Sequence, residues 1–160
     1  MDDSSVLAAK LRAEGEKMRQ FMAQLDDAEW AVEVYTEGAT WTVRSIFAHL
    51  MTTERAFLKL LDQIRRGGTG VSAEFVIDRY NASQQKKTQS MNRQELLQEY
   101  QAARRSMVEL VNDLSAEDLE KRGRHPFLGT TSLREMVKMI YIHNQTHHRD
   151  VRRALKNPQV

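Results

Sequence analysis

Residues 41–64 have the sequence WTVRSIFAHLMTTERAFLKLLDQI, which carries a long apolar pattern of helical spacing. Its apolar residues return at steps of three and four, the spacing of one buried face of an α-helix. Thr42 is a suitable N-cap, and Trp41 before it can pack against the first turn. The glycines within 67–70 then stop the helix. The stretch therefore predicts a long amphipathic helix.

The same spacing predicts three more long helices, over residues 4–25, 92–114 and 132–155. Asn92 and Ser132 are suitable N-caps, and each is followed three residues later by a glutamate that completes a capping box. Because the chain shows no strong strand signal, these helices indicate an all-α four-helix bundle.

The connections between the long helices differ in length and character. Residues 26–40 form an irregular link, and 75–89 predict a short extra helix between the second and third long helices. A helical turn at 115–118 is followed by an irregular loop over 124–129. The long second connection leaves room for a crossover, so we expect a single four-helix-bundle domain over residues 1–160.

Composition is that of an ordinary folded domain, with 41% apolar and 29% charged residues in a chain of 160. No run approaches about 18 apolar residues, so we expect no membrane span. The acidic start, residues 1–5, lacks the basic and apolar segments of a signal peptide. We therefore expect a soluble, cytoplasmic protein.

The absence of cysteine and the small net charge exclude several kinds of chemistry. Without cysteine there is no disulfide, thiolate ligand or cysteine nucleophile, so a metal must use His, Asp, Glu or water. The formal charge is only +2, and the basic run 149–156 is typical of a solvated helix C-terminus. We therefore expect no nucleic-acid partner.

Three histidines carry the pattern of a metal site. His143 and His147 are four residues apart, which places both imidazoles on one face of the last helix. His49 lies at the border of the apolar stripe of the helix over 41–64, so it also points into the bundle. Three inward imidazoles predict a divalent-metal site, although hydrogen-bonded core histidines are the alternative.

A neighbouring register competes for the ligands of the last helix. Asn144 and His148 also stand four residues apart, on the other flank of the same apolar stripe. Asparagine is a poor transition-metal ligand beside histidine, so His143 and His147 are preferred. Asn144 and His148 then become outer or edge residues.

Glu54 is an unexpected carboxylate near the middle of an apolar stripe. A buried carboxylate is costly unless it is paired. It can orient a metal-binding imidazole, act as a base on bound water, or form a simple buried ion pair. We take Glu54 as the candidate catalytic residue. Asp150, three residues after His147, is either an outer partner of the site or an exposed partner of a neighbouring arginine.

At these residues the chain resembles the DinB/YfiT-like superfamily of metal-binding four-helix bundles. The resemblance rests on two motifs, Trp41 to Leu50 with Glu54 following, and His143-Asn144-Gln145-Thr146-His147 with Val151 following. Segments 77–81 and 123–129 are similar to an uncharacterised subgroup of DinB-like proteins.

The resemblance implies an up-down-down-up bundle, often a homodimer, with zinc or nickel on three histidines. It implies metal ligands His49, His143 and His147, whereas another common form of the motif places them at the Asn144/His148 register. Tyr80, Asn81 and His125 are expected at the site entrance through the subgroup likeness.

The implied activity is that of a divalent-metal-dependent enzyme acting on a small-molecule substrate. Transfer or isomerisation with an external low-molecular-weight thiol, as in an S-transferase, is the first expectation. A metal-dependent hydrolase or a non-catalytic metal-binding, stress-response protein is the alternative.

Overall fold

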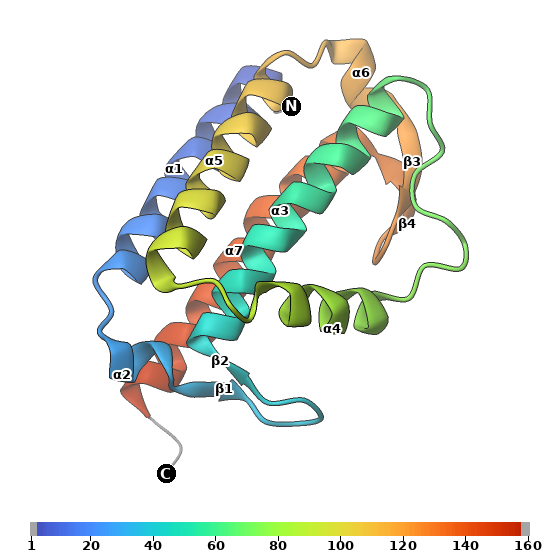
Figure 1. Ribbon diagram of the computed structural model, residues 1–160. Helices are drawn as coiled ribbons and strands as arrows, with labels where there is room; N and C mark the ends of the chain where they lie inside the picture. Colours follow the sequence, from blue (N-terminus) through green and yellow to red (C-terminus); the bar gives the residue numbers. More distant parts are fainter. Residues whose placement is uncertain (1–2, 158–160) are drawn as a thin grey trace.

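Four long helices form the bundle in the computed structural model, which describes residues 3–157. They are α1 (Ser4–Ala23), α3 (Val43–Arg65), α5 (Arg93–Asn112) and α7 (Leu133–Lys156). Figure 1 shows α3 and α5 running in the same direction, with α1 and α7 opposite to them. The expected up-down-down-up four-helix bundle is therefore confirmed.

Three short helices lie in the connections: α2 (Asp27–Trp30), α4 (Ile77–Thr88) and α6 (Ala116–Glu120). The expected extra helix is α4, which crosses α3 at a steep angle (Figure 1). Arg44 of α3 donates to the carbonyls of Thr88 and Met91 at 2.6 and 2.7 Å. These bonds fix the crossover between the parallel helices α3 and α5.

The expectation of irregular links is wrong in two places, where short antiparallel hairpins form. One pairs β1 (Glu33–Tyr35) with β2 (Trp41–Thr42), and the other pairs β3 (Arg122–His125) with β4 (Gly129–Ser132). Strands of two to four residues are too short to show the alternation of apolar and polar residues that marks a strand. Packing against the helices stabilises them instead.

The predicted N-caps hold, with one difference. Thr42 accepts from the Ser45 amide, and Asn92 forms a complete capping box. Ser132 accepts from the amide of Glu135, but the Glu135 carboxylate lies 3.5 Å from Lys138 instead of returning to the cap. The capping box expected at α7 is therefore wrong, because a lysine in the next turn offers a charged partner.

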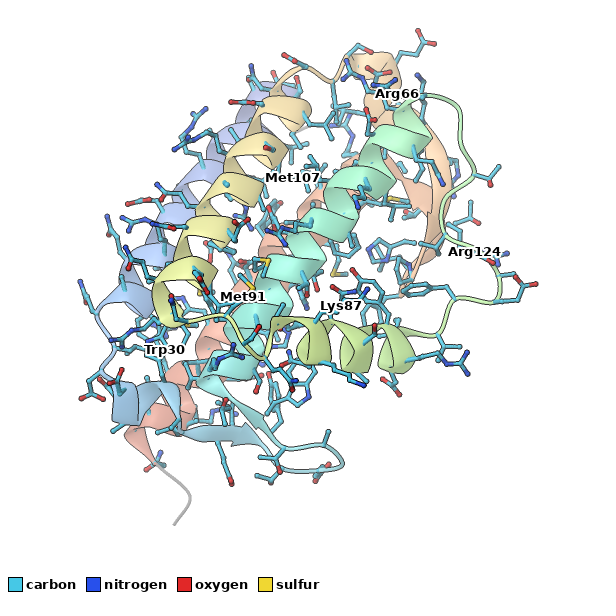
Figure 2. The ribbon with its side chains drawn as sticks, in the orientation of Figure 1. Trp30, Arg66, Lys87, Met91, Met107 and Arg124 are labelled. Atoms are coloured by element: carbon cyan, nitrogen blue, oxygen red, sulfur yellow. The ribbon has the colours of Figure 1, made fainter. Side chains whose placement is uncertain are left out.

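The core consists of two apolar clusters separated by a polar layer. Trp30 belongs to one cluster and Met107 to the other (Figure 2). Between them lie buried residues that are part of neither cluster, among them Gly15, Glu54, Arg104 and Asn144, one from each long helix. Within residues 3–157, no helix combines the length and apolar character needed to cross a membrane.

Candidate metal centre

His49, His143 and His147 meet between α3 and α7, and we call them the histidine cluster. The Nε2 atom of His143 lies 3.1 Å from Nε2 of His49 and 3.0 Å from Nε2 of His147. One ligand atom from each residue lies within 4.8 Å of the other two. Nitrogen ligands at zinc distances and tetrahedral angles stand about 3.3 Å apart, so small ring rotations suffice to hold an ion.

The helical period explains this convergence. His143 and His147 stand one turn apart on the face of α7 that meets α3, and His49 reaches them from the antiparallel helix. The neighbouring register points elsewhere. The Asn144 amide accepts from the Tyr100 hydroxyl at 2.7 Å and donates to a backbone carbonyl, while His148 packs on an aromatic ring. The preferred register is thus the one whose side chains converge.

The contacts within the histidine cluster cannot both be full-strength hydrogen bonds. Nε2 of His143 faces two other Nε2 atoms, and a neutral ring nitrogen offers either one hydrogen or one lone pair, which the two partners would have to share. A cation among three lone pairs satisfies all three nitrogens, so the donor set fits a divalent ion.

Burial keeps these imidazoles neutral. It lowers the pKa of His49 and His143 to about 3, and the charges of neighbouring histidines act in the same direction. Burial also lowers the pKa of His147 to about 4, although Asp150 opposes the shift. At neutral pH the rings are therefore unprotonated, which is the form that binds metal.

A tyrosine and a carboxylate fix the tautomer of His147. The Tyr35 hydroxyl donates to Asp150 Oδ2 at 2.5 Å and lies 3.0 Å from Nδ1 of His147. Since the hydroxyl has one hydrogen, it accepts from Nδ1–H of His147, which leaves Nε2 with a lone pair. Second partners of this kind orient metal-binding histidines and strengthen them as ligands.

His49 is held by groups of its own. Its Nδ1 lies 3.3 Å from the Thr53 hydroxyl, one turn along α3, and the Trp41 ring meets its ring at 5.0 Å between centroids. Trp41 comes from the β1–β2 hairpin, as Tyr35 does. The hairpin therefore supports two of the three imidazoles.

Sequence reasoning missed Tyr35 and anticipated Asp150 only in part. Asp150 was expected to be either an outer partner of the site or a partner of a neighbouring arginine, and it is both, since it also binds Arg149 at 3.1 Å. Its spacing from His147 was the usable signal. Tyr35 gave none, because it lies 112 residues from His147 in a stretch expected to be irregular.

Glu54 lies in a buried ion pair. Its two oxygens accept from Nε and Nη2 of Arg104 at 2.5 and 3.0 Å, and the side chain is only 1% exposed. Of the roles weighed for Glu54, the structure displays the ion pair. Both oxygens face Arg104, and the catalytic role stays a prediction.

The three residues expected at the entrance differ in position. Tyr80 of α4 is half-buried against Phe75, with 5.5 Å between ring centroids, and Asn81 follows it on α4. His125 ends β3, where it is buried and stacks on Phe57 at 5.1 Å. His125 is near enough for its charge to act on His143, after the larger effects of burial and His147.

Comparisons with known proteins agree with this architecture. The model of the DinB superfamily matches residues 7–151. The search of curated proteins found no match. Among solved structures, YfiT from Bacillus subtilis, described as a probable metal-dependent hydrolase with an unusual four-helix bundle topology, is 15% identical with a TM-score of 0.78, covering 94% of this chain and 84% of that one.

Two further structures share the fold. A mycothiol-dependent maleylpyruvate isomerase is 15% identical with a TM-score of 0.77, and the match covers 94% of this chain but 63% of the isomerase. The colibactin self-resistance protein ClbS, solved in complex with double-stranded DNA, is 12% identical with a TM-score of 0.79 and 99% coverage of both chains. At these identities the likeness shows the fold alone.

Proposed function

This chain belongs to the DinB superfamily, and on that premise we propose that it is a metal-dependent enzyme whose single divalent ion is held by His49, His143 and His147. The observation that carries the proposal is the convergence of three neutral Nε2 atoms, two of them 3.0 and 3.1 Å from the third. Imidazole donors suit zinc and nickel.

Neighbouring residues of the chain orient the imidazoles. Tyr35 and Asp150 hold His147 with its Nε2 lone pair directed at the cluster, and Thr53 holds His49. When bound, a divalent ion on three neutral ligands retains open positions and lowers the pKa of a coordinated thiol or water. This arrangement supports catalysis better than a structural role, which normally uses four protein ligands.

The reaction that we propose first is transfer or isomerisation with a low-molecular-weight thiol. The chain has no cysteine, so the thiol comes from outside. A structural neighbour described as mycothiol-dependent supports this choice. Hydrolysis is the second candidate, because the same ion activates water and YfiT is described as a probable metal-dependent hydrolase. A non-catalytic metal-binding role is the third.

Metal content tests the site directly. We expect one equivalent of metal per chain in untagged wild-type protein, and its loss in His49→Ala and His147→Ala. The matched control is His148→Ala, which removes a buried histidine of the same helix outside the cluster. A wild type that cannot be loaded, or a His148→Ala variant that loses metal equally, contradicts the proposal.

Activity separates the candidate reactions. Loaded protein is screened with cellular thiols and an electrophilic acceptor, and in parallel with simple esters and amides. Thiol consumption lost in His147→Ala supports S-transfer, and hydrolysis lost in the same variant supports the second candidate. Turnover in neither screen favours a binding role.

We propose a homodimer acting on a small molecule in the cytoplasm, which light scattering and cell fractionation test. We also propose that the protein does not bind nucleic acid. Because ClbS was solved with double-stranded DNA, a gel-shift measurement is needed here, and a salt-resistant shift contradicts this part of the proposal.

A further inference from the structure

We propose that His125 binds the substrate of the histidine cluster by donating a hydrogen bond from Nε2 to an acceptor oxygen of that molecule. The inference rests on the proposed function, because it assigns a substrate-binding residue to the same site. It also names the chemical class of the substrate. Either the thiol or the molecule that reacts with it carries a carboxylate or carbonyl oxygen.

The tip of the β3–β4 hairpin fixes the tautomer of His125. Its Nδ1 accepts from the backbone amides of Phe127 and Leu128 at 3.1 and 3.2 Å. A ring nitrogen that accepts carries no hydrogen, so the neutral ring must carry it on Nε2. Two amide hydrogens pointing at Nδ1 also oppose its protonation. His125 is therefore a fixed neutral donor.

The donor has no partner in the part of the chain that the structure describes. His125 is only 2% exposed, and its Nε2 atom is buried without a hydrogen-bond partner. Leaving a buried donor unpaired destabilises the protein. An acceptor supplied by a ligand removes this cost, and the energy then appears as affinity.

His125 lies over α3 about two helical turns from the proposed ligand His49. His49, Thr53 and Phe57 follow one another at four-residue steps along one face of α3, about 6 Å per step. His125 stacks on Phe57 at 5.1 Å with an angle of 25° between the rings. The α3 face that carries His49 thus continues directly beneath His125.

The strands β3 and β4 also pack against α7, the other helix of the site. Figure 1 shows the tip of the β3–β4 hairpin directed toward α4. Phe127 at this tip is 70% exposed, which gives the ligand an apolar contact beside the donor.

Cobalt-loaded protein offers a direct test with small thiols. Binding of mercaptoacetate, 3-mercaptopropionate and 4-mercaptobutyrate is compared with ethanethiol, propanethiol and butanethiol through the thiolate-to-cobalt absorption band. We expect at least one acid to bind about tenfold more tightly than its matched alkanethiol, the effect of one buried hydrogen bond. Equal affinities for all three pairs overturn the proposal.

Two substitutions separate the acceptor role of Nδ1 in His125 from the donor role of its Nε2. Asparagine in His125→Asn keeps an acceptor near the Nδ1 position for the hairpin amides but has no donor near Nε2, so we expect the preference for the acid to fall below twofold. Glutamine in His125→Gln carries an amide donor near the Nε2 position and should restore part of the preference. A preference unchanged in His125→Asn overturns the proposal.

Nuclear magnetic resonance of the wild-type protein tests the proposal even if a His125 variant does not fold. In zinc-loaded wild type, the Nε2–H resonance of His125 should move when the preferred acid is added and stay in place with its alkanethiol. A resonance that no acid moves overturns the proposal. Failure of the proposed function is separate, since it appears as wild-type protein that takes up no cobalt or gives no thiolate band.

Discussion

The Glu54–Arg104 pair lies at the level where the core changes from one apolar cluster to the other. Nε and Nη2 of Arg104 bind both Glu54 oxygens, and Nη1 donates to the Leu11 carbonyl at 2.8 Å. Burial is the largest single effect and acts to lower the pKa of Arg104, but the charge and hydrogen bonds of Glu54, together with smaller effects of neighbouring groups, raise it. The arginine is therefore charged, and it depends on Glu54 for compensation.

Removing only the carboxylate leaves that charge buried and unpaired. We expect Glu54→Leu to lower the free energy of unfolding by about 3–5 kcal/mol, the usual effect of breaking one side of a buried pair. In a chain of this length each kcal/mol lowers the melting temperature by about 2–4 °C, so the loss is roughly 6–20 °C. Urea and thermal unfolding followed by circular dichroism measure both quantities.

The double variant Glu54→Leu with Arg104→Met decides between structure and catalysis. It replaces both charges by apolar groups of similar size, so we expect stability within about 1 kcal/mol of wild type, or above it. If Glu54 takes part in the chemistry, this stable variant binds metal without turnover. A single variant that loses less than about 1 kcal/mol of unfolding free energy, or a double variant no more stable than the single variant, contradicts this role of the ion pair.

Three further predictions concern the metal site, its pH dependence and a turn. Tyr35→Phe removes the bridging hydroxyl beside the cluster and should weaken metal binding about 10–100-fold in a chelator competition, whereas the control Tyr141→Phe should leave it unchanged. Burial lowers the pKa of the three cluster histidines from 6.5 to about 3 or 4, so the unfolded chain binds more protons between those values. Metal-free protein should therefore lose stability as pH falls from about 6.5 to about 4, by up to about 1.4 kcal/mol per pH unit per histidine, and His49→Gln should show a shallower slope in urea unfolding. A flat profile contradicts this reasoning. Gly70 and Gly38 both have positive φ, +96° and +77°, but only at Gly70 does an added Cβ meet the backbone, at 2.2 Å. Gly70→Ala should therefore cost clearly more than the roughly 1–2 kcal/mol expected for Gly38→Ala, and equal melting temperatures speak against it.

The long helices, and the faces of those helices on which the three imidazoles lie, could be predicted from the sequence. Both depend on the helical period, which converts spacing along the chain into position in space. Once the residues around His49 and His143 were placed on apolar faces, their convergence followed from the packing of two helices. The preference for the His143/His147 register followed from ligand chemistry, because asparagine at 144 is a poor metal ligand, and in the structure His148 packs on Phe21.

The residues that contact the site residues could not be predicted from the sequence. Glu54 was identified as a buried carboxylate, but the pattern left several partners open, and Arg104 lies 50 residues away on another helix. Tyr35 and the buried position of His125 depend on hairpins whose strands have two to four residues. Such strands form through tertiary packing, and their residues carry no periodic signal of their own.

The metal ligands lie on helices of the bundle, whereas the residues around them lie on hairpins. The proposed ligands all stand on α3 and α7, which the buried core holds rigidly, so the geometry of the ion is set by the bundle. The residues that orient or neighbour these ligands, Tyr35 and His125, come from hairpins outside the bundle. A change in either hairpin can therefore alter ligand strength or substrate binding while the three imidazoles stay in place. On this argument, substitutions in the bundle core should affect metal content first, and substitutions in the β3–β4 hairpin should affect the choice of substrate.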